Sequence, residues 1–190
     1  KVVHLMELQF YNRSYQPLID GYLLVESQLQ FTRHAQECVQ LASETRTPVL
    51  ALVDRKLVTY FDLHRDEGVE PYSDNPNAIL VRAFSTDVRE QRKGYAKQAL
   101  TLLPGFVKQH FPLIDEIVLA VNVGNEVAQA LYQKVGFIDY GERRIGPKGE
   151  LIIMSYLLNR GSINGCERNF TSVHKSNKYT PIGTSKNIIK

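Results

Sequence analysis

Apolar runs rich in β-branched and aromatic residues recur at short intervals along the first 158 residues of the chain. Runs of this kind, bounded by polar and turn-forming residues, predict β-strands. Since only Arg55 separates the second run from the third, these two are predicted to form a hairpin. The expected strands lie at residues 5–11, 48–54, 56–64, 78–84 and 116–123, with a final antiparallel pair between residues 136 and 158.

Between these runs, apolar positions recur every three or four residues, which is the helical period. Residues 31–44 follow this period, and Thr32 is their predicted N-cap. Residues 125–136 begin with Asn125, a favourable N-cap, and end with Gly136, a favourable C-cap. The sequence therefore predicts a helix over each segment.

A longer helical stripe, at positions 96, 99, 100, 103 and 107, follows a loop that contains glycine. Pro104 and Gly105 interrupt the stripe, because proline cannot donate a helical hydrogen bond and glycine is a weak helix former. We therefore expect a kink or a break there. Strands that alternate with helices around this loop predict a mixed α/β domain.

Composition divides the chain near residue 158. Residues 1–158 hold the predicted strands and helices, so we expect them to form one domain. Residues 159–190 are rich in Ser, Asn, Lys and Gly, a composition typical of a flexible tail. The chain has a net charge of +3, but its tail holds six Lys or Arg against one acid, Glu167. The domain is thus slightly acidic, and we do not expect it to bind nucleic acid.

Cysteine usage and hydropathy add two expectations. Cys38 and Cys166 lie far apart and fit no metal-binding spacing, so we expect two reduced thiols, no bound metal and a cytoplasmic protein. No apolar run approaches the ~18 residues that a membrane-spanning helix needs, so no membrane contact is expected.

The hexapeptide QRKGYA, residues 91–96, lies between a predicted strand and the longer helix. A helix N-terminus exposes unpaired N–H groups and the positive end of the helix dipole, and this arrangement binds phosphates. Gly94 allows a ligand to approach the backbone closely, and Arg92 and Lys93 add positive charge. A phosphorylated ligand is therefore expected; a solvated turn is the alternative for the loop alone.

This loop resembles the Gln/Arg-x-x-Gly-x-Gly/Ala motif of the GNAT family of N-acetyltransferases, with Gln91, Gly94 and Ala96 at its defining positions. Residues 121–137 resemble the Asn-x-x-Ala-x-x-Leu-Tyr-x-x-x-Gly-Phe segment of the same family. The matching residues are Asn125, Ala128, Leu131, Tyr132, Gly136 and Phe137. The resemblance covers residues 2–158 and loosely favours the branch that acetylates polyamines and other small amines.

The resemblance implies both a fold and a ligand. The fold is a mixed, mostly antiparallel central sheet of about seven strands, flanked by helices, with two strands splayed apart at the cofactor. Acetyl-CoA is the implied cosubstrate, its pyrophosphate on the loop amides and its pantetheine along the preceding strand. The implied cofactor contacts are Phe84, Thr86, Gln91, Arg92, Lys93, Gly94, Tyr95, Ala96 and Asn125.

The resemblance also implies direct acetyl transfer to a primary amine of a small molecule or peptide. Tyr132 would protonate the departing thiolate, and a backbone N–H near Thr86 would stabilise the oxyanion. Because Tyr132 lies two helical turns after Asn125, both are expected on one face; a core role is the alternative for Tyr132. The sequence does not identify the general base, and the candidates are Glu26, Asp62 and His64, the last two on one face of a strand.

Six acids between residues 54 and 74 would attract a cationic amine if they bordered the substrate groove, and a solvated loop is the alternative. They are Asp54, Asp62, Asp66, Glu67, Glu70 and Asp74. Two other functions stay open: a sensor that binds a CoA ester without turnover, and a module that binds a partner or nucleic acid through the basic tail. A homodimer also stays open.

Overall fold

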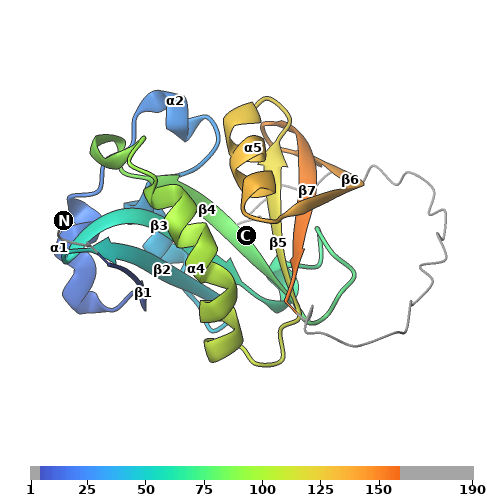
Figure 1. The fold of residues 1–190 in the computed structure, drawn as a ribbon, viewed down its shortest axis with the longest axis horizontal. Helices are drawn as coiled ribbons and strands as arrows, with labels where there is room; N and C mark the ends of the chain where they lie inside the picture. The colour runs from blue at the N-terminus through green and yellow to red at the C-terminus, as the bar shows by residue number, and fades with distance from the viewer. Residues whose placement is uncertain (1–4, 159–190) are drawn as a thin grey trace, which may run out of the picture.

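The computed structural model describes residues 5–158, and a seven-stranded sheet forms their centre (Figure 1). The order of strands in the sheet is β1-β2-β3-β4-β5-β7-β6, and neighbours are antiparallel except β4 and β5. The strands are β1 (Met6–Phe10), β2 (Arg46–Val53), β3 (Lys56–His64), β4 (Ala78–Thr86), β5 (Glu116–Asn122), β6 (Ile138–Gly146) and β7 (Gly149–Leu157). The predicted fold class is confirmed. The predicted tail, residues 159–190 with Cys166, lies outside the described residues.

Helices cover both faces of the sheet (Figure 1). They are α1 (Gln16–Asp20), α2 (Glu26–Leu29), α3 (Ala35–Cys38), α4 (Tyr95–His110) and α5 (Glu126–Lys134). Short 3-10 turns add η1 (Arg13–Tyr15), η2 (Val39–Leu41), η3 (Asp66–Gly68) and η4 (Val88–Glu90). Within residues 5–158, no helix is long and apolar enough to span a membrane.

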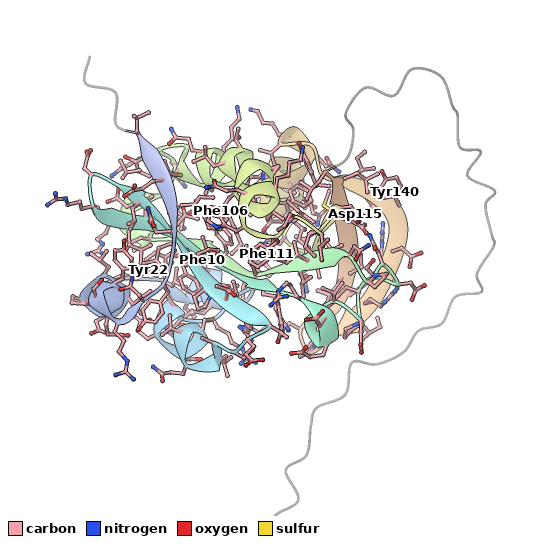
Figure 2. The ribbon with its side chains drawn as sticks, turned by 90° about the horizontal axis from the view of Figure 1, so that it is seen from below. Phe10, Tyr22, Phe106, Phe111, Asp115 and Tyr140 are labelled. Atoms are coloured by element: carbon pink, nitrogen blue, oxygen red, sulfur yellow. The ribbon has the colours of Figure 1, made fainter. Side chains whose placement is uncertain are left out.

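The two largest apolar clusters lie on opposite faces of the sheet. On one face, Leu103 of α4 and Tyr132 of α5 belong to the same cluster as strand side chains. On the other face, Cys38 of α3 and Tyr22 pack against β2 and β3. Phe10 of β1 packs on Phe106 of α4 with ring centroids 4.9 Å apart, and Tyr22 lies on the other side of the sheet (Figure 2). The alternation of strand side chains thus fills both cores at once.

A bulge in β4 determines which of its side chains face α4 and α5. Two residues of β4, Ala83 and Phe84, lie opposite Phe61 of β3. Ala83 has a φ of 51°, an uncommon value for a residue other than glycine. Val81 and Phe84 both pack in the core under α4, although strict alternation would place them on opposite faces. The extra residue therefore returns Phe84 to the face of α4 and α5.

The parallel pair β4 and β5 is joined over only part of its length. The pairing runs from Ala78 opposite Glu116 to Val81 opposite Leu119. Beyond this point β4 follows β3 to Thr86, whereas β5 follows β7 to Asn122. The two strands diverge, as the predicted splayed pair requires, and leave an opening in the sheet.

Helix α4 continues through Pro104 to His110, so of the predicted kink or break, the break is wrong. Pro104 removes the hydrogen bond that its N–H would donate to the carbonyl of Leu100. Leu103 and Val107, on either side of the proline, are fully buried. Burial of this stripe against the sheet holds the helix together across the missing bond.

The predicted helix over residues 31–44 is shorter in the structure. Helix α3 begins at Ala35, its N-cap is His34, and a 3-10 turn follows it. The predicted cap at Thr32 is therefore wrong. The N–H of Thr32 instead donates to the carbonyl of Gln28 and closes the turn after α2.

We predict that Ala83→Val lowers the free energy of unfolding by about 1–3 kcal/mol, because a β-branched side chain fits a positive φ poorly. Ala83→Gly should keep or raise it, since glycine adopts this conformation without steric cost. Urea unfolding measures both. Ala42→Val is the matched control, because Ala42 is exposed and has a φ of −59°. Equal losses in the two valine variants would contradict backbone strain at Ala83.

Candidate active site

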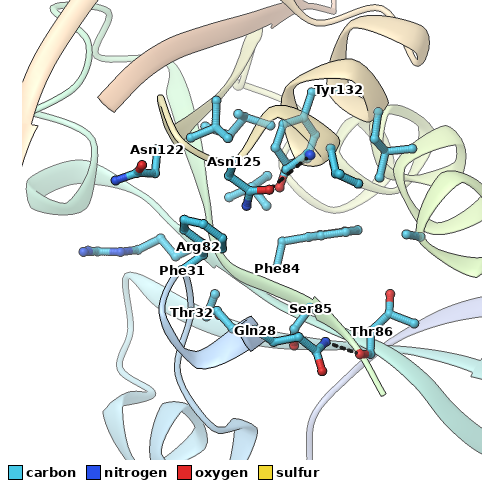
Figure 3. Close-up of a pocket in the computed structure, with 18 of the residues that line it drawn as sticks. Gln28, Phe31, Thr32, Arg82, Phe84, Ser85, Thr86, Asn122, Asn125 and Tyr132 are labelled. Atoms are coloured by element: carbon cyan, nitrogen blue, oxygen red, sulfur yellow. Dashed lines mark hydrogen bonds between the residues drawn. The ribbon is translucent and has the colours of Figure 1, made fainter. Parts of the chain in front are cut away.

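A cavity of about 680 Å³ fills the opening between β4 and β5 (Figure 3). Residues Leu80–Thr86 of β4 and Leu119–Asn122 of β5 form its sides. The loop before α4, the first turn of α4, helix α5 and the segment that contains α2 form most of the remaining lining. The cavity is therefore lined from both faces of the sheet.

The residues predicted to contact the cofactor line this cavity, with one exception. Phe84, Thr86, Gln91, Arg92, Gly94, Tyr95, Ala96 and Asn125 all belong to the lining, and so does Tyr132. Lys93 does not, because its ammonium group turns to the carboxylate of Glu90, 2.9 Å away. The two sequence motifs, about 30 residues apart, thus meet at one site.

The loop before α4 is shaped to bind an anion. Arg92 and Gly94 have φ values of 62° and 84°, so left-handed residues alternate with others along the loop. Such alternation gathers successive N–H groups into an anion-binding concavity. Gly94 is the N-cap of α4 and has no side chain to accept from the first N–H groups of the helix. These donors point to a phosphorylated ligand.

A buried carboxylate lies beneath this loop. Glu90 is only 4% exposed and forms ion pairs with Lys56 and Lys93. The hydrogen bond from Lys56, followed by the one from Lys93, lowers the pKa of Glu90. The charge of Lys93 is therefore paired with Glu90 rather than directed at a ligand. Arg92 and Lys97, both exposed at the lining, remain as the cations nearest the loop.

The end of β4 offers backbone groups to the cavity. The N–H of Asp87 donates to the carbonyl of Val58 in β3, so alternation turns the backbone groups of Thr86 away from β3. The side-chain amide of Gln28 donates to the Thr86 carbonyl at 2.8 Å (Figure 3). This carbonyl is thus already engaged, and the N–H of Thr86 is the group that can meet a ligand.

Helix α5 brings Asn125 and Tyr132 to the cavity, on one face as predicted (Figure 3). The Asn125 side chain accepts from the N–H of Ala128 at 3.3 Å and so caps the helix. Its amide nitrogen remains the donor that can reach a ligand. The Tyr132 ring meets the Phe84 ring edge to face, with centroids 6.1 Å apart. Burial raises the pKa of Tyr132, so its hydroxyl stays protonated at neutral pH.

None of the three candidate bases lines the cavity. Asp62 is fully buried on the other face, where it accepts from Arg46 Nε at 2.8 Å and from the Tyr60 hydroxyl at 2.5 Å. His64 lies 3.3 Å from Glu67, and burial lowers its pKa. Asp62 therefore stabilises the fold rather than contacting a ligand. Over the described part of the lining there is no histidine and one carboxylate, Glu90, so the base stays unassigned.

The six acids of residues 54–74 do not border the cavity. From this segment only Tyr72 belongs to the lining. The expectation that these acids line the substrate groove and attract a cationic amine is therefore not supported. Sequence reasoning also missed several lining residues on this side, among them Gln28, Phe31, Thr32 and Arg82. The sequence does contain one signal for Arg82, which is the single charged residue within the apolar run AILVRAF.

Comparisons with known proteins agree with this geometry. The model of the acetyltransferase (GNAT) family matches residues 10–137. A curated protein of Bacillus subtilis (strain 168), "Uncharacterized N-acetyltransferase YbbJ", is 41% identical over 156 residues, which cover 80% of this chain and 98% of that protein.

Solved structures share the fold at low identity. Spermidine N-acetyltransferase from Vibrio cholerae, in complex with CoA and spermine, aligns with a TM-score of 0.62 and 15% identity, covering 80% of this chain and 95% of that one. Aminoglycoside acetyltransferase AAC(6')-Ib, in complex with coenzyme A, aligns with a TM-score of 0.66 and 17% identity over the same shares. The Escherichia coli ribosomal-protein-S18-alanine N-acetyltransferase aligns with a TM-score of 0.59 and 15% identity, covering 85% and 99%.

We predict that Arg46→Met lowers the free energy of unfolding by about 3–5 kcal/mol, because it leaves the buried Asp62 carboxylate without its cation. Adding Asp62→Asn should recover most of this loss, since the neutral amide still accepts from Tyr60. Urea unfolding of the single and double variants measures the effect. Asp62→Asn alone should keep turnover within about threefold of wild type, well short of the loss that follows removal of a general base. A hundredfold loss of turnover in a stably folded Asp62→Asn protein would instead return Asp62 to the reaction.

Proposed function

The chain belongs to the acetyltransferase (GNAT) family, and we propose that it moves the acetyl group of acetyl-CoA directly to the primary amine of a small molecule. One observation carries the proposal. A single cavity joins an anion-binding helix N-terminus at Gly94 to a buried tyrosine hydroxyl at Tyr132. The first suits the phosphates of coenzyme A, and the second suits the departing thiolate.

Acetyl-CoA is the cosubstrate, and the chain's own groups account for its binding. The amides from Gln91 to Ala96 would hold the pyrophosphate, with Arg92 and Lys97 alongside. The N–H of Thr86 and the Asn125 amide would then meet the pantetheine arm and the thioester end. Lys93 acts indirectly in this arrangement, because it holds Glu90 beneath the loop.

The transfer needs no covalent enzyme intermediate. The neutral amine attacks the thioester carbonyl, and the N–H of Thr86 is the donor proposed for the resulting oxyanion. When the carbon–sulfur bond breaks, the Tyr132 hydroxyl gives its proton to the thiolate, and the amine nitrogen loses a proton to solvent. Solvent then returns a proton to Tyr132, so the enzyme ends in its starting state. Cys38 takes no part, since it is buried outside the cavity and burial raises its pKa to about 11.

The sensor alternative is weaker on the same geometry. A protein that only binds a CoA ester has no need of a protonated hydroxyl at the thioester end, yet Tyr132 lines the cavity there. Retention of this group favours turnover. Release of free thiol from acetyl-CoA in the presence of an amine panel would decide between the two.

We predict that Gly94→Val abolishes the stabilisation that coenzyme A gives to the wild-type protein. That stabilisation is about 2.7 kcal/mol at a hundredfold excess of ligand over Kd, and it appears as a higher melting temperature. The valine side chain would occupy space that the phosphates need and would strain a φ of 84°.

Gly141→Val is the matched control for this experiment. Gly141 has a φ of 91° and, like Gly94, has no atoms within 4 Å of an added Cβ, but it lies in β6 outside the cavity lining. The Gly141→Val protein should be less stable than wild type but should still be stabilised by coenzyme A. An undiminished response in Gly94→Val would remove this loop from the binding site.

We predict that Tyr132→Phe keeps coenzyme A binding and lowers kcat by about 10²–10⁴-fold, the usual worth of a general acid. Because burial raises the pKa of Tyr132, the wild-type rate should go on rising with pH up to about 10, where a free amine loses its proton. Steady-state rates from pH 6 to 10 measure both. Turnover of the variant within about twofold of wild type would exclude Tyr132 as the acid, because loss of a general acid lowers the rate far more than this.

A further inference from the structure

The cavity contains a cation that no described carboxylate neutralises. The guanidinium of Arg82 lies 3.1 Å from Nδ1 of His64, and no ion pair joins it to an acid within residues 5–158. Asp62 is its neighbour across the sheet register, but that carboxylate is engaged by Arg46 and Tyr60. Burial lowers the pKa of Arg82, and the nearby charge of Asp62 offsets this only in part.

Arg82 lies on the side of the sheet opposite the proposed phosphate site. Ala78 and Leu80 pack on the face away from α4 and α5, so Arg82, two residues further along β4, lies on that face too. Arg82 and Phe84 extend in different directions from the strand (Figure 3). The lining also includes Tyr72 and residues of α2 and of the segment that follows it. An acceptor that enters from this face would meet Arg82 before the thioester.

A second polar group on this side of the cavity, the hydroxyl of Thr32, has no hydrogen-bond partner among the described residues. Its oxygen, Oγ1, is buried, although Thr32 lines the cavity. A buried hydroxyl without a partner is costly, so such an atom marks a place where a ligand or a water completes the bonding. Thr32 and Arg82 come from different elements, and both can donate to an anionic oxygen.

The charge of the lining excludes a polycation as the best fit. Glu90 is the one carboxylate of the described lining, and two lysines already hold it. A second ammonium group of an acceptor would find no anion there and would be repelled by Arg82. A planar guanidinium is instead well matched to a carboxylate, which it binds through two parallel hydrogen bonds.

We propose that the acceptor carries a carboxylate beside its amine, as an amino acid does, and that Arg82 binds this carboxylate with help from the Thr32 hydroxyl. This inference rests on the proposed function, because it names the substrate class of the same site. Phe31 and Leu151, which also belong to the lining, would contact the apolar part of such an acceptor. Arg82 is then a specificity-determining residue rather than a member of the reacting group.

Matched pairs of amines test the proposal. Leucine and isopentylamine, tyrosine and tyramine, and ornithine and putrescine differ by one carboxylate within each pair. Thiol release from acetyl-CoA gives kcat/KM for each amine, compared at equal concentrations of the uncharged amine. We expect the best-used amino acid to exceed its carboxylate-free counterpart by about 10- to 100-fold, the range for a charge-assisted hydrogen bond.

Variants of Arg82 separate recognition from folding. Arg82→Met keeps the apolar stem and removes the charge, so it should abolish the preference within each pair by lowering kcat/KM for the amino acids. Putrescine should be used better than by wild type, because its second ammonium group is no longer repelled. Arg82→Lys should retain part of the preference, since it keeps the charge and loses the fork. Arg13→Met is the matched control, because Arg13 is exposed in η1 and lies outside the lining. Melting temperatures identify any variant that fails to fold.

Equilibrium dialysis of leucine against protein loaded with coenzyme A tests binding without turnover. Binding that Arg82→Met removes, with no acetylation of any amine, would support this inference and overturn the proposed function. Acetylation that favours isopentylamine, tyramine or putrescine, or a preference unchanged in well-folded Arg82→Met, would overturn the inference and leave the acetyltransferase intact. Neither binding nor turnover with any of the six amines would overturn both.

Discussion

The divergence of β4 and β5 is the constraint on which the rest of the structure depends. Every backbone N–H and C=O inside a sheet needs a partner, and these two strands stop pairing after Val81 and Leu119. Each strand keeps an antiparallel neighbour on its other edge, β3 for β4 and β7 for β5, so divergence leaves only the inner edges unpaired. The side chain of Gln28 reaches one of these groups, the Thr86 carbonyl. The remaining groups are directed at whatever occupies the cavity.

This opening lets one cavity use both faces of the sheet, and the charges differ between the two. On the face of α4, backbone amides and the exposed Arg92 and Lys97 suit a phosphorylated ligand. On the face of α2, the partly buried Arg82 is the charged group near the opening. The buried Glu90 is neutralised by lysines beneath the loop and does not offset either cation. The arrangement favours two ligands that both carry negative charge and that enter from opposite sides.

Much of the fold and part of the site could be predicted, because the period of apolar residues and the helix caps depend on residues that are close together in the sequence. The strands, the hairpin at Arg55 and the Asn125 cap all follow from short stretches of sequence. The break expected at Pro104 does not occur, because burial of the neighbouring residues outweighs one lost hydrogen bond, and burial depends on distant residues. Asp62 was a plausible base because strand alternation predicts which face of the sheet it lies on. Alternation does not predict its partner, Arg46, which lies sixteen positions earlier in the chain. Arg82 was overlooked for a similar reason: the strand register places it opposite Asp62, and only the structure shows that Arg46 and Tyr60 already engage that carboxylate.

Ala83 has a consequence for how this protein can change over evolutionary time. The bulge places two residues, Ala83 and Phe84, opposite Phe61 alone. If Ala83 were lost, Phe84 would stand alone opposite Phe61, and the residues after it would keep both their partners in β3 and their faces. Loss of one residue from the evenly paired part of β4, between Ala78 and Val81, would instead exchange inward and outward positions. Among diverging descendants, single-residue gaps within β4 should therefore gather at the bulge.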